Sequence, residues 1–393
     1  MKIGFVYDAL YPHLNGGAEK RYHELGVRLA ERHEVHWVTW QFWEERPDSS
    51  LDSITLHGVG RPGRFYGADG KRTVREAASF AARIVPHLLR EHYDVVDCSA
   101  TPYLPLYAAW MATRVSRTPL VATWHEFWGE YWDDYLPHRP VVARVARRLE
   151  ASCAGMGDAR VAVSPFTASR LTKARRGAPV RVVGNGVSLS QIAAVTPTRG
   201  RSDVIFVGRL IEDKQVDLLI RAVARLGETL PGLRCQIVGD GPARPSLEAL
   251  ARSLQVAAQV RFTGSVDGEQ VIRLVKAAKV LAFPSRREGF GISVIEAQAC
   301  GIVPIVVASP LSAASALIHD DVDGLVCAES EEALAASIAS LLGDRRRLTA
   351  MRARARDAAA AWDWDVIALQ MEAVYRETVD APAPGRRTLQ APS

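Results

Sequence analysis

The sequence predicts an α/β protein of two doubly wound domains, each built on a parallel sheet. Short β-branched runs alternate with longer helical patterns, which is typical of parallel sheets with crossover helices. The 393 residues, 48% of them hydrophobic, exceed the length that one hydrophobic core usually supports. A polar, turn-rich stretch at 188–202 separates two groups of strand-like runs. We therefore expect two domains that face a deep cleft.

The expected elements follow from these runs. In the first domain, residues 1–187, we place strands at 2–7, 35–39, 54–59, 95–98, 120–123, 160–163 and 180–183. In the second domain, residues 203–360, we place them at 204–207, 235–238, 260–263, 280–283, 304–307 and 324–327. We expect an interdomain linker at 188–202, a C-terminal helix at 361–379 that returns to the first domain, and a disordered tail at 380–393.

Composition argues against several classes of protein. The net charge is +5, but 49 basic residues are scattered among 44 acidic ones, which argues against a nucleic-acid partner. The five cysteines form no Cys-x-x-Cys pair, which favours reduced thiols over disulfides or zinc. No apolar run approaches the roughly 20 residues that span a bilayer, and the N-terminus does not resemble a signal peptide. We expect a cytoplasmic protein, and the sequence carries no signal for its oligomeric state.

A glycine pair follows the first expected strand. Gly16 and Gly17 come after Asn15, where the first helix is expected to begin. Without side chains, they let backbone N–H groups approach an anion at the positive end of a helix dipole. A tight strand-to-helix turn explains the pair equally well. The Gly-x-Gly-x-x-Gly fingerprint of dinucleotide sites is absent at this position.

Two basic residues follow the first strand of the second domain. Arg209 and Lys214 come shortly after the run 204–207, at the carboxyl edge where parallel sheets bind ligands. Both cations can neutralise a diphosphate, and solvated surface charges are the alternative. A glycine-rich turn from Gly239 ends the next strand and is expected to face the same crevice, which favours binding.

The most specific segment runs from Glu288 to Glu296. Glu288 begins a glycine-rich turn after the strand-like run 280–283. Glu296 comes eight positions later, and we expect it about two turns into a helix at 292–300. Two carboxylates so placed can accept hydrogen bonds from vicinal hydroxyls, on a sugar ring at one end and a ribose at the other. A helix cap plus a surface glutamate is the alternative.

The ordered set of motifs resembles the retaining glycosyltransferases of family four, which have the GT-B fold of two Rossmann-like domains. The segments that carry the resemblance are Gly16-Gly17, Trp124-His125, Asn185-Gly186-Val187, Gly208-Arg209-Leu210 with Lys214, the turn at 238–242, the segment from Pro284-Ser285 through Glu288 to Glu296, and the helix at 362–375. They match the family in order and cover most of the chain. One departure is the stretch 308–314, where the family often has a glycine-rich turn.

The resemblance implies a donor site for a nucleotide diphosphate sugar. Arg209 and Lys214 would bind the diphosphate, Glu288 the transferred sugar, and Glu296 the ribose. Together with His125, the first three of these would carry catalysis. The donor-binding residues that the resemblance implies are Gly16, Gly17, Asn185, Arg209, Lys214, Gly239, Arg261, Phe262, Glu288, Gly289, Phe290, Gly291, Ile292 and Glu296.

The acceptor is expected on the first domain. His125 matches the position of a family histidine near the transferred sugar and the acceptor, and a structural role is the alternative for a histidine after a strand. Its unperturbed pKa of about 6.5 would leave either protonation state accessible. Asp8, Trp124, Glu126 and Trp128 are weaker acceptor candidates. Aromatic residues repeat at helical spacing over 128–135, so packing is the main alternative to a stacking platform.

Basic residues near these segments suggest contact with an anionic membrane or a lipid-linked acceptor. They are Arg61, Arg64, Lys71, Arg72, Arg75, Arg139, Arg144, Arg147 and Arg148. Solvated helix faces explain them nearly as well.

These expectations combine into one function. A retaining, metal-independent glycosyltransferase would move a hexose-type sugar from a UDP- or GDP-sugar to a natural-product, cell-envelope glycan or lipid acceptor. No cofactor is expected, because Arg209, Lys214 and the helix N-terminus at Gly17 can stabilise the leaving group. The Asp-x-Asp pairs at 321–323 and 363–365 are interpreted as a polar turn and a helix start, not as metal sites. A nucleotide-sugar epimerase, a phosphorylase and a non-catalytic nucleotide-sugar-binding protein stay open as alternatives.

Overall fold

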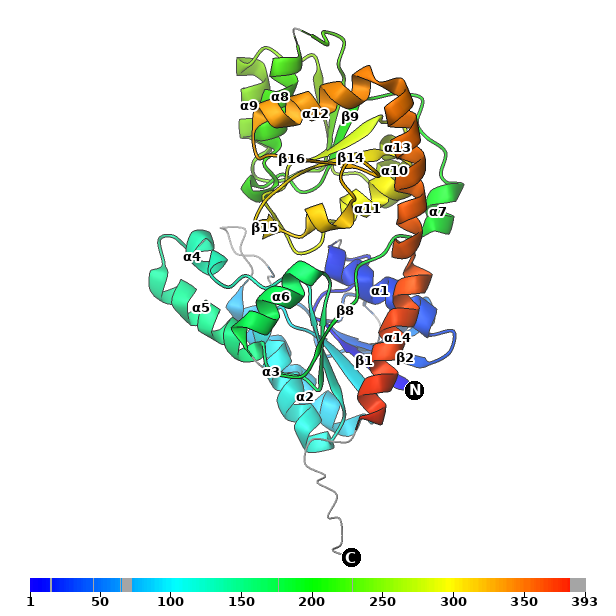
Figure 1. The fold of residues 1–393 in the computed structure, drawn as a ribbon. Helices are drawn as coiled ribbons and strands as arrows, with labels where there is room; N and C mark the ends of the chain where they lie inside the picture. The colour runs from blue at the N-terminus through cyan, green and yellow to red at the C-terminus, as the bar shows by residue number, and fades with distance from the viewer. Residues whose placement is uncertain are drawn as a thin grey trace, which may run out of the picture. The chain divides into compact units, whose positions relative to one another are not determined.

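The computed structural model describes residues 1–14, 16–44, 46–63, 65, 73–175, 177–227 and 229–381. The chain forms two compact units, which Figure 1 shows as ribbons. The first unit is Met1–Gly184 together with the chain from Asp365, and the second is Asn185–Trp364. Asn15, Arg64, Lys71, Arg72 and the expected tail beyond 381 lie outside the described residues.

The first unit is built on an eight-stranded sheet in the order β3-β4-β2-β1-β5-β6-β7-β8. Its strands are β1 (Lys2–Val6), β2 (Glu34–Thr39), β3 (Asp48–Leu51), β4 (Ile54–Gly58), β5 (Val95–Ser99), β6 (Leu120–Trp124), β7 (Ala159–Ala162) and β8 (Val180–Val182). The seven strands expected in this domain are all present and parallel. The eighth, β3, pairs antiparallel with β4. The sequence analysis missed it because its four residues are short of apolar side chains.

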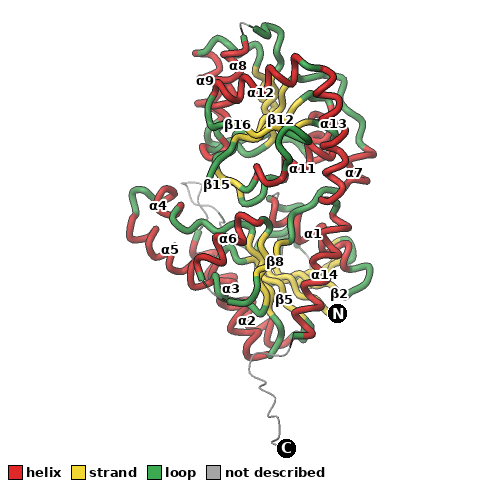
Figure 2. Tube along the Cα trace, in the orientation of Figure 1, coloured by secondary structure: helices red, strands yellow, loops and turns green. Residues whose placement is uncertain are grey.

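Helices flank both faces of this sheet, as the red segments in Figure 2 show. They are α1 (Gly17–Leu29), α2 (Val74–Arg90), α3 (Tyr103–Ser116), α4 (Tyr131–Tyr135), α5 (Pro140–Cys153), α6 (Pro165–Ala174) and α14 (Trp364–Asp380). The C-terminal helix α14 thus belongs to the same unit as the N-terminal strand.

Alternation along the strands gives the first sheet two different faces. Val96 of β5 packs into an apolar core with α2 and α3. The next residue, Asp97, points to the opposite face, where it accepts hydrogen bonds from Tyr22 of α1 and Tyr375 of α14. Trp37 of β2 lies on this second face, with its ring 5.9 Å from that of Tyr22. The face under α2 and α3 is therefore mostly apolar, apart from a cluster of His36, His57 and His87, whereas the other face carries buried polar groups under α1 and α14.

The second unit is built on a six-stranded sheet in the order β11-β10-β9-β12-β14-β16, and all its pairs are parallel. Its strands are β9 (Val204–Val207), β10 (Cys235–Val238), β11 (Val260–Gly264), β12 (Val280–Phe283), β14 (Val303–Val307) and β16 (Leu325–Cys327). The six expected strands are therefore confirmed. The strand order reverses between β9 and β12, and ligands bind at such switch points in doubly wound sheets.

Short elements complete the second unit. Its helices are α7 (Leu189–Ala194), α8 (Val216–Leu226), α9 (Arg244–Ser253), α10 (Gly268–Lys276), α11 (Ile292–Ala299), α12 (Glu331–Gly343) and α13 (Arg345–Ala358), with the single turns η1 (Glu212–Lys214), η2 (Ala314–Leu317) and η3 (Ala359–Trp362). A separate two-stranded pair is formed by β13 (Arg287–Glu288) and β15 (Leu311–Ser312). The expected linker at 188–202 is not wholly irregular, since α7 lies within it and Ser188 caps that helix.

Two further expectations concern the chain as a whole. All five cysteines are buried and unpaired, as the sequence analysis expected. Within the described part of the chain, no helix combines the length and the apolar character that crossing a membrane would require.

Candidate functional site

Three backbone turns stack at the carboxyl edge of the second sheet, after β9, β10 and β11. The Gly208 N–H donates to the Val238 carbonyl at 3.0 Å, and the Gly239 N–H donates to the Gly264 carbonyl at 2.9 Å. Gly239 has φ +130°, and an added Cβ would lie 1.9 Å from the Gly208 carbonyl oxygen. Only glycine allows this approach. The turns therefore form a compact backbone platform beside Arg209.

The two basic residues expected at this edge differ in their surroundings. Arg209 is exposed directly after the β9 turn. Lys214 ends η1 and forms an ion pair with Glu288, with 20% and 14% of the two side chains exposed. The fold thus brings together a lysine and a glutamate that lie 74 positions apart in the sequence.

A second ion pair, which the sequence analysis did not predict, lies beside the first. The Asp213 carboxylate accepts a hydrogen bond from Arg287 Nε at 3.0 Å, and both side chains are 14% exposed. The Arg286 N–H also donates to the Asp213 carbonyl at 2.9 Å. Each partner is the sequence neighbour of a candidate residue, Asp213 of Lys214 and Arg287 of Glu288. Opposite charges at these neighbouring positions were the signal that could have revealed the pair.

The stretch 308–314, which departs from the family pattern, supports the backbone of Glu288. Part of it forms β15, which pairs with β13 so that Glu288 lies opposite Ser312. The Ala313 N–H then donates to the Glu288 carbonyl at 2.9 Å. The single turn η2 follows immediately. The departure therefore replaces a glycine-rich turn with a short strand that fixes Glu288.

The helix α11 begins directly after Gly291, its N-cap, which has φ +112°. A residue with a Cβ would be strained in this conformation. The side chain of Phe290 is buried and packs edge-on against Trp362, with ring centroids 5.4 Å apart. Glu296 is half-buried and is the fifth residue of the helix, which begins at Ile292. It lies just over one turn into α11 and not two as expected, because the turn from Glu288 occupies the intervening residues.

Two expected donor residues are not at the edge. Arg261 is the second residue of β11, opposite Gln236 of β10, and is exposed. Phe262 is half-buried and packs against the apolar core of the second unit. The strand continues to Gly264, so both residues precede the end at which the turns stack. Contact of this segment with the donor base, expected to be made largely by its backbone, stays a prediction.

In the first unit, the glycine pair forms the start of α1. Gly16 is the N-cap, Gly17 is the first helical residue, and both are exposed. Gly16 offers no side chain to cap the first turn, and Glu19 is the acidic residue of that turn. An added Cβ at Gly16 would meet a Glu19 carboxylate oxygen at 2.3 Å. Asn185, the remaining donor candidate, is buried, with 4% of its surface exposed.

His125 follows β6, on the side of Tyr7 and Tyr22. Its ring centroid lies 6.4 Å from that of Tyr7 and 6.1 Å from that of Tyr22. Its Nε2 is buried and has no hydrogen-bond partner within the described ranges. Burial, together with the Arg21 charge, lowers the pKa of His125 to about 3. The imidazole is therefore neutral near neutral pH, and the expectation of two accessible protonation states was wrong, because the sequence did not reveal the burial.

The weaker acceptor candidates are divided by burial. Trp124 is fully buried and lies against the Tyr103 ring of α3, so its expected contact with an acceptor is wrong. Strand alternation turns this side chain into the apolar core. Asp8 is also buried, with 1% exposed. Glu126 and Trp128 are half-buried, and the Trp128 Nε1–H donates to the Glu126 carboxylate at 2.9 Å.

The aromatic residues over 128–135 pack on one another. The Trp128 ring lies 4.6 Å from Trp132 and 4.8 Å from Tyr135, centroid to centroid. The buried Glu150 of α5 accepts hydrogen bonds from the backbone N–H groups of Trp128 and Gly129 at 2.8 and 2.7 Å. Packing, the alternative considered above, therefore accounts for this cluster.

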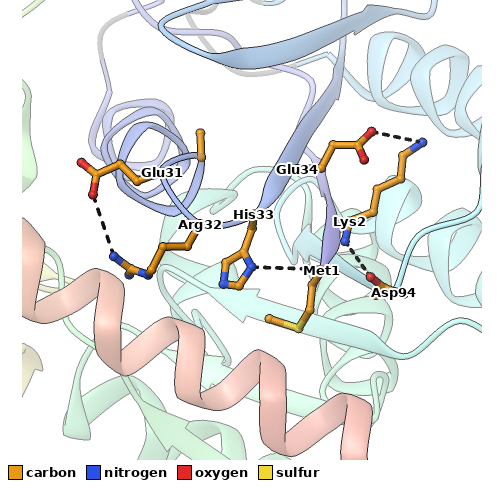
Figure 3. A pocket seen from close by; sticks show the side chains of 8 residues that line it. Met1, Lys2, Glu31, Arg32, His33, Glu34 and Asp94 are labelled. Carbon is orange, nitrogen blue, oxygen red and sulfur yellow. Dashed lines mark hydrogen bonds and ion pairs between the residues drawn. The ribbon is translucent and has the colours of Figure 1, made fainter.

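A pocket of about 600 Å³ opens at the amino ends of β1 and β2 (Figure 3). Its lining consists of Met1, Lys2, Ala30, Glu31, Arg32, His33, Glu34 and Asp94. Lys2 is paired there, with its ammonium 3.7 Å from Glu34 and its backbone N–H 2.6 Å from Asp94. The candidate residues of both sheets follow the carboxyl ends of strands, so this pocket is not part of the candidate site.

Both Asp-x-Asp pairs have structural partners. Asp323 accepts a hydrogen bond from the His319 N–H at 2.7 Å, and Asp363 accepts one from the Leu189 N–H at 3.3 Å. Asp365 pairs with Arg28 at 2.5 Å. Among the residues that the structure describes, no three His, Cys, Asp or Glu side chains are grouped for a metal ion.

Comparisons with known proteins cover both halves of the chain. Residues 15–191 match the family model described as Glycosyltransferase Family 4, and residues 191–360 match Glycosyl transferases group 1. D-inositol 3-phosphate glycosyltransferase of Thermobispora bispora is 31% identical over 73% of this chain and 71% of its own length. Glycogen synthase of Mycobacterium tuberculosis is 33% identical over 50% of this chain. The match spans about half of that relative, 48% of its length.

Solved structures show the same fold. A sucrose-phosphate synthase from Thermosynechococcus elongatus has a TM-score of 0.80 at 20% identity, over 96% of this chain and 98% of its own. HepE of Anabaena in complex with UDP has a TM-score of 0.75 at 18% identity, over 96% of this chain and 100% of its own. These likenesses confirm the expected GT-B fold. With both family models and a relative of 31% identity matched, the chain belongs to the family four, group 1 glycosyltransferases.

Proposed function

We propose that this chain is a retaining glycosyltransferase that needs no metal and transfers a hexose-type sugar from a UDP- or GDP-sugar. The observation that carries the proposal is the Lys214–Glu288 ion pair after β9 and β12, next to the glycine turns. Solved relatives support the donor class, since HepE of Anabaena was crystallised with UDP and with UDP-glucose. The acceptor is proposed to be a natural product, a cell-envelope glycan or a lipid.

The proposed chemistry needs little covalent work from the protein. The bond between the anomeric carbon and the diphosphate breaks, its electron pair leaves with the diphosphate, and the acceptor atom forms the new bond while its proton passes to the departing diphosphate oxygen. Arg209 and Lys214 neutralise the charge that grows on the leaving group. Glu288 accepts hydrogen bonds from the transferred sugar, and Glu296 accepts them from the ribose. Retention, through front-face attack or a short-lived ion pair, rests on the family resemblance.

His125 has a narrower role in this proposal than the sequence suggested. A neutral imidazole with a buried, unpartnered Nε2 within the described chain can accept or donate one hydrogen bond. An unmade hydrogen bond on a buried group is costly, so a ligand hydroxyl that reaches Nε2 gains affinity. His125 then orients a sugar or acceptor hydroxyl and does not serve as a general acid.

Metal independence is tested with a chelator. Activity is expected to persist in excess EDTA, because Arg209 and Lys214 supply the charge stabilisation. Complete loss in EDTA that magnesium or manganese restores would overturn this part of the proposal.

The alternatives predict different products. An epimerase converts the donor without an acceptor, a phosphorylase consumes inorganic phosphate, and a binding-only protein gives no product. Donor turnover is therefore measured with wild type, Glu288→Ala and the control Glu269→Ala, which removes an exposed glutamate that pairs with Arg273. The proposal expects loss only in Glu288→Ala, and equal rates in all three would remove Glu288 from the mechanism.

The donor nucleotide is identified by binding. A thermal-shift or calorimetric screen of UDP, GDP, ADP and TDP is expected to show one preferred diphosphate, with UDP or GDP first. Stabilisation by none of the four would contradict a nucleotide diphosphate donor. The anomeric configuration of the product, read by NMR coupling constants, then tests retention directly.

We also propose that the protein is cytoplasmic and touches an anionic membrane when its acceptor is a lipid. On α5, Val141 and Val145 are 68% and 59% exposed, and Arg144 and Arg148 are exposed beside them. Such a face suits a membrane interface. Flotation with anionic and zwitterionic vesicles tests this membrane contact. If the protein floats with neither kind of vesicle, the proposed contact is rejected.

A further inference from the structure

The hydrogen-bonding hub under α1 and α14 has no role in the proposed reaction so far. Asp97 of β5 is buried, with 1% exposed, and its carboxylate accepts three side-chain hydroxyl hydrogen bonds. The donors are Tyr22 of α1 at 3.0 Å, Thr123 of β6 at 2.7 Å and Tyr375 of α14 at 2.6 Å. One carboxylate therefore joins four elements, including the C-terminal helix, across 278 positions of sequence.

A buried cation accompanies this carboxylate. The guanidinium of Arg21 is fully buried, donates a hydrogen bond to the Gly184 carbonyl and contacts Met371 Sδ of α14 at 3.9 Å. Burial lowers the pKa of Arg21, whereas the opposite charge of Asp97 raises it. Leaving either charge alone inside the protein would be costly, so the two charges depend on each other.

The hub reaches His125 by two routes. Thr123, which donates to Asp97, lies two positions before His125 and directly before Trp124, the last residue of β6. Tyr22, which donates to Asp97, presents its ring edge-on to His125, with centroids 6.1 Å apart and planes at 69°. One wall of the histidine site is thus held in place by a hydroxyl bound to Asp97.

We propose that Asp97 and Arg21 are positioning residues for His125. They hold the imidazole through Tyr22 and Thr123, and they couple it to the C-terminal helix α14 through Tyr375. The hub sets the ring orientation of His125, and Arg21 supplies the positive charge beside it. The inference rests on the proposed function for the role of His125, but the positioning itself is a property of the first unit. The proposal requires that α14 packs in place for the His125 ring to be ordered.

The charge of the hub gives a test that loss of packing cannot imitate. Selective ¹³C labelling of histidine in the full chain, with His125→Gln for assignment, follows the His125 ring by NMR titration. Arg21→Met removes the cation and leaves Asp97, so the His125 titration is expected to move upward by at least one pH unit. Asp97→Asn removes the anion and leaves Arg21, so the titration is expected to stay at or below that of wild type. Equal upward movement in both variants would show only water entry and would overturn the proposal.

A conservative variant covers the case in which the charge variants do not fold. Tyr375→Phe removes one hydroxyl from Asp97 and is expected to broaden or shift the His125 ring signal. Its matched control is Tyr93→Phe, since the Tyr93 hydroxyl is bonded to His87 Nε2 at 2.8 Å. Both variants lose one buried phenol hydrogen bond, so similar losses of melting temperature are expected, with the His125 signal changed only in Tyr375→Phe.

Activity separates this proposal from the proposed function. Tyr375→Phe is expected to lower kcat three- to tenfold with the KM for donor little changed, because Arg209, Lys214 and Glu296, which are proposed to hold the nucleotide, lie in the second unit. A changed His125 signal with no transferase activity in wild type would leave the positioning intact and reject the function. An unchanged His125 signal in Tyr375→Phe would reject the positioning.

Discussion

The candidate edges of the two sheets differ in the exposure of their charged groups. In the second unit, Lys214 and Glu288 are partly exposed and pair with each other. In the first unit, His125 is neutral and packed against aromatic rings, and the charge of Asp97 is buried beneath α1 and α14. The second edge thus presents a pair of opposite charges that a charged ligand could separate, whereas the first edge presents a neutral imidazole packed against aromatic rings.

The largest expected effect comes from breaking the Lys214–Glu288 ion pair. Lys214→Ala removes a charge that the proposal places on the leaving group, so kcat/KM is expected to fall about 100-fold or more. The melting temperature is measured as well, because removing one partner of a pair with only 20% and 14% of its side chains exposed costs stability. The control Lys279→Ala breaks another lysine pair, with Asp203, and is expected to keep full activity. A loss of less than threefold in Lys214→Ala would contradict the comparison.

The backbone platform of the second edge is expected to show the next largest effect, this time on stability. Gly239→Ala places a Cβ 1.9 Å from the Gly208 carbonyl oxygen at a positive φ. The free energy of unfolding is expected to fall by about 2 kcal/mol or more. At Gly232, nothing lies within 4 Å of an added Cβ, so Gly232→Ala serves as the control in denaturant melts. Equal stabilities in the two variants would show that the turns do not need their close contact.

A smaller effect is expected from the pair that supports Lys214 and Glu288. Asp213→Asn weakens the ion pair with Arg287, so the neighbouring Lys214 and Glu288 are held less firmly. The value of kcat/KM is therefore expected to fall about tenfold. The charge-swapped double variant Asp213→Arg/Arg287→Asp is expected to recover part of this loss. Recovery is measured in a double-mutant cycle, and strict additivity would show that the two side chains act independently.

The smallest expected effect is on acid stability in the first unit. Burial, with the neighbouring charge of His57, lowers the pKa of His87 to about 4. Below about pH 6.5 the unfolded chain binds a proton that the folded chain rejects, so this residue lowers stability as the pH falls from about 6.5 to 4. His87→Gln is expected to flatten the dependence of melting temperature on pH in that window. The exposed residue His138 provides the control, His138→Gln, and identical pH profiles in both variants would contradict the assignment.

The fold could be predicted largely because buried parallel strands are marked by β-branched runs. The strands that were missed are too short or too polar to give such a signal, as in β3, β13 and β15. Within the site, motif spacing predicted that Lys214 and Glu288 lie at one edge. It did not predict their ion pair, because the position of Glu288 depends on the pairing of strands β13 and β15.

Burial was the main property that the sequence did not reveal. Trp124 and His125 are neighbours, yet strand alternation sends the first into the apolar core and leaves the second beside α1. Their sequence context alone could not separate these environments. The same limit applies to Asp97, since its three donors come from segments that only the folded chain brings together.

The most direct test of the central claim separates the two carboxylates of the second edge. Affinities for UDP and for the preferred nucleotide sugar are measured by calorimetry in Glu288→Gln and Glu296→Gln, together with the rate of transfer. The account predicts that Glu296→Gln weakens both ligands about tenfold, as expected for a lost hydrogen bond to ribose. It predicts that Glu288→Gln retains UDP affinity and loses transfer at least 100-fold. Unchanged transfer in Glu288→Gln, or an equal loss of UDP affinity in both variants, would contradict the account.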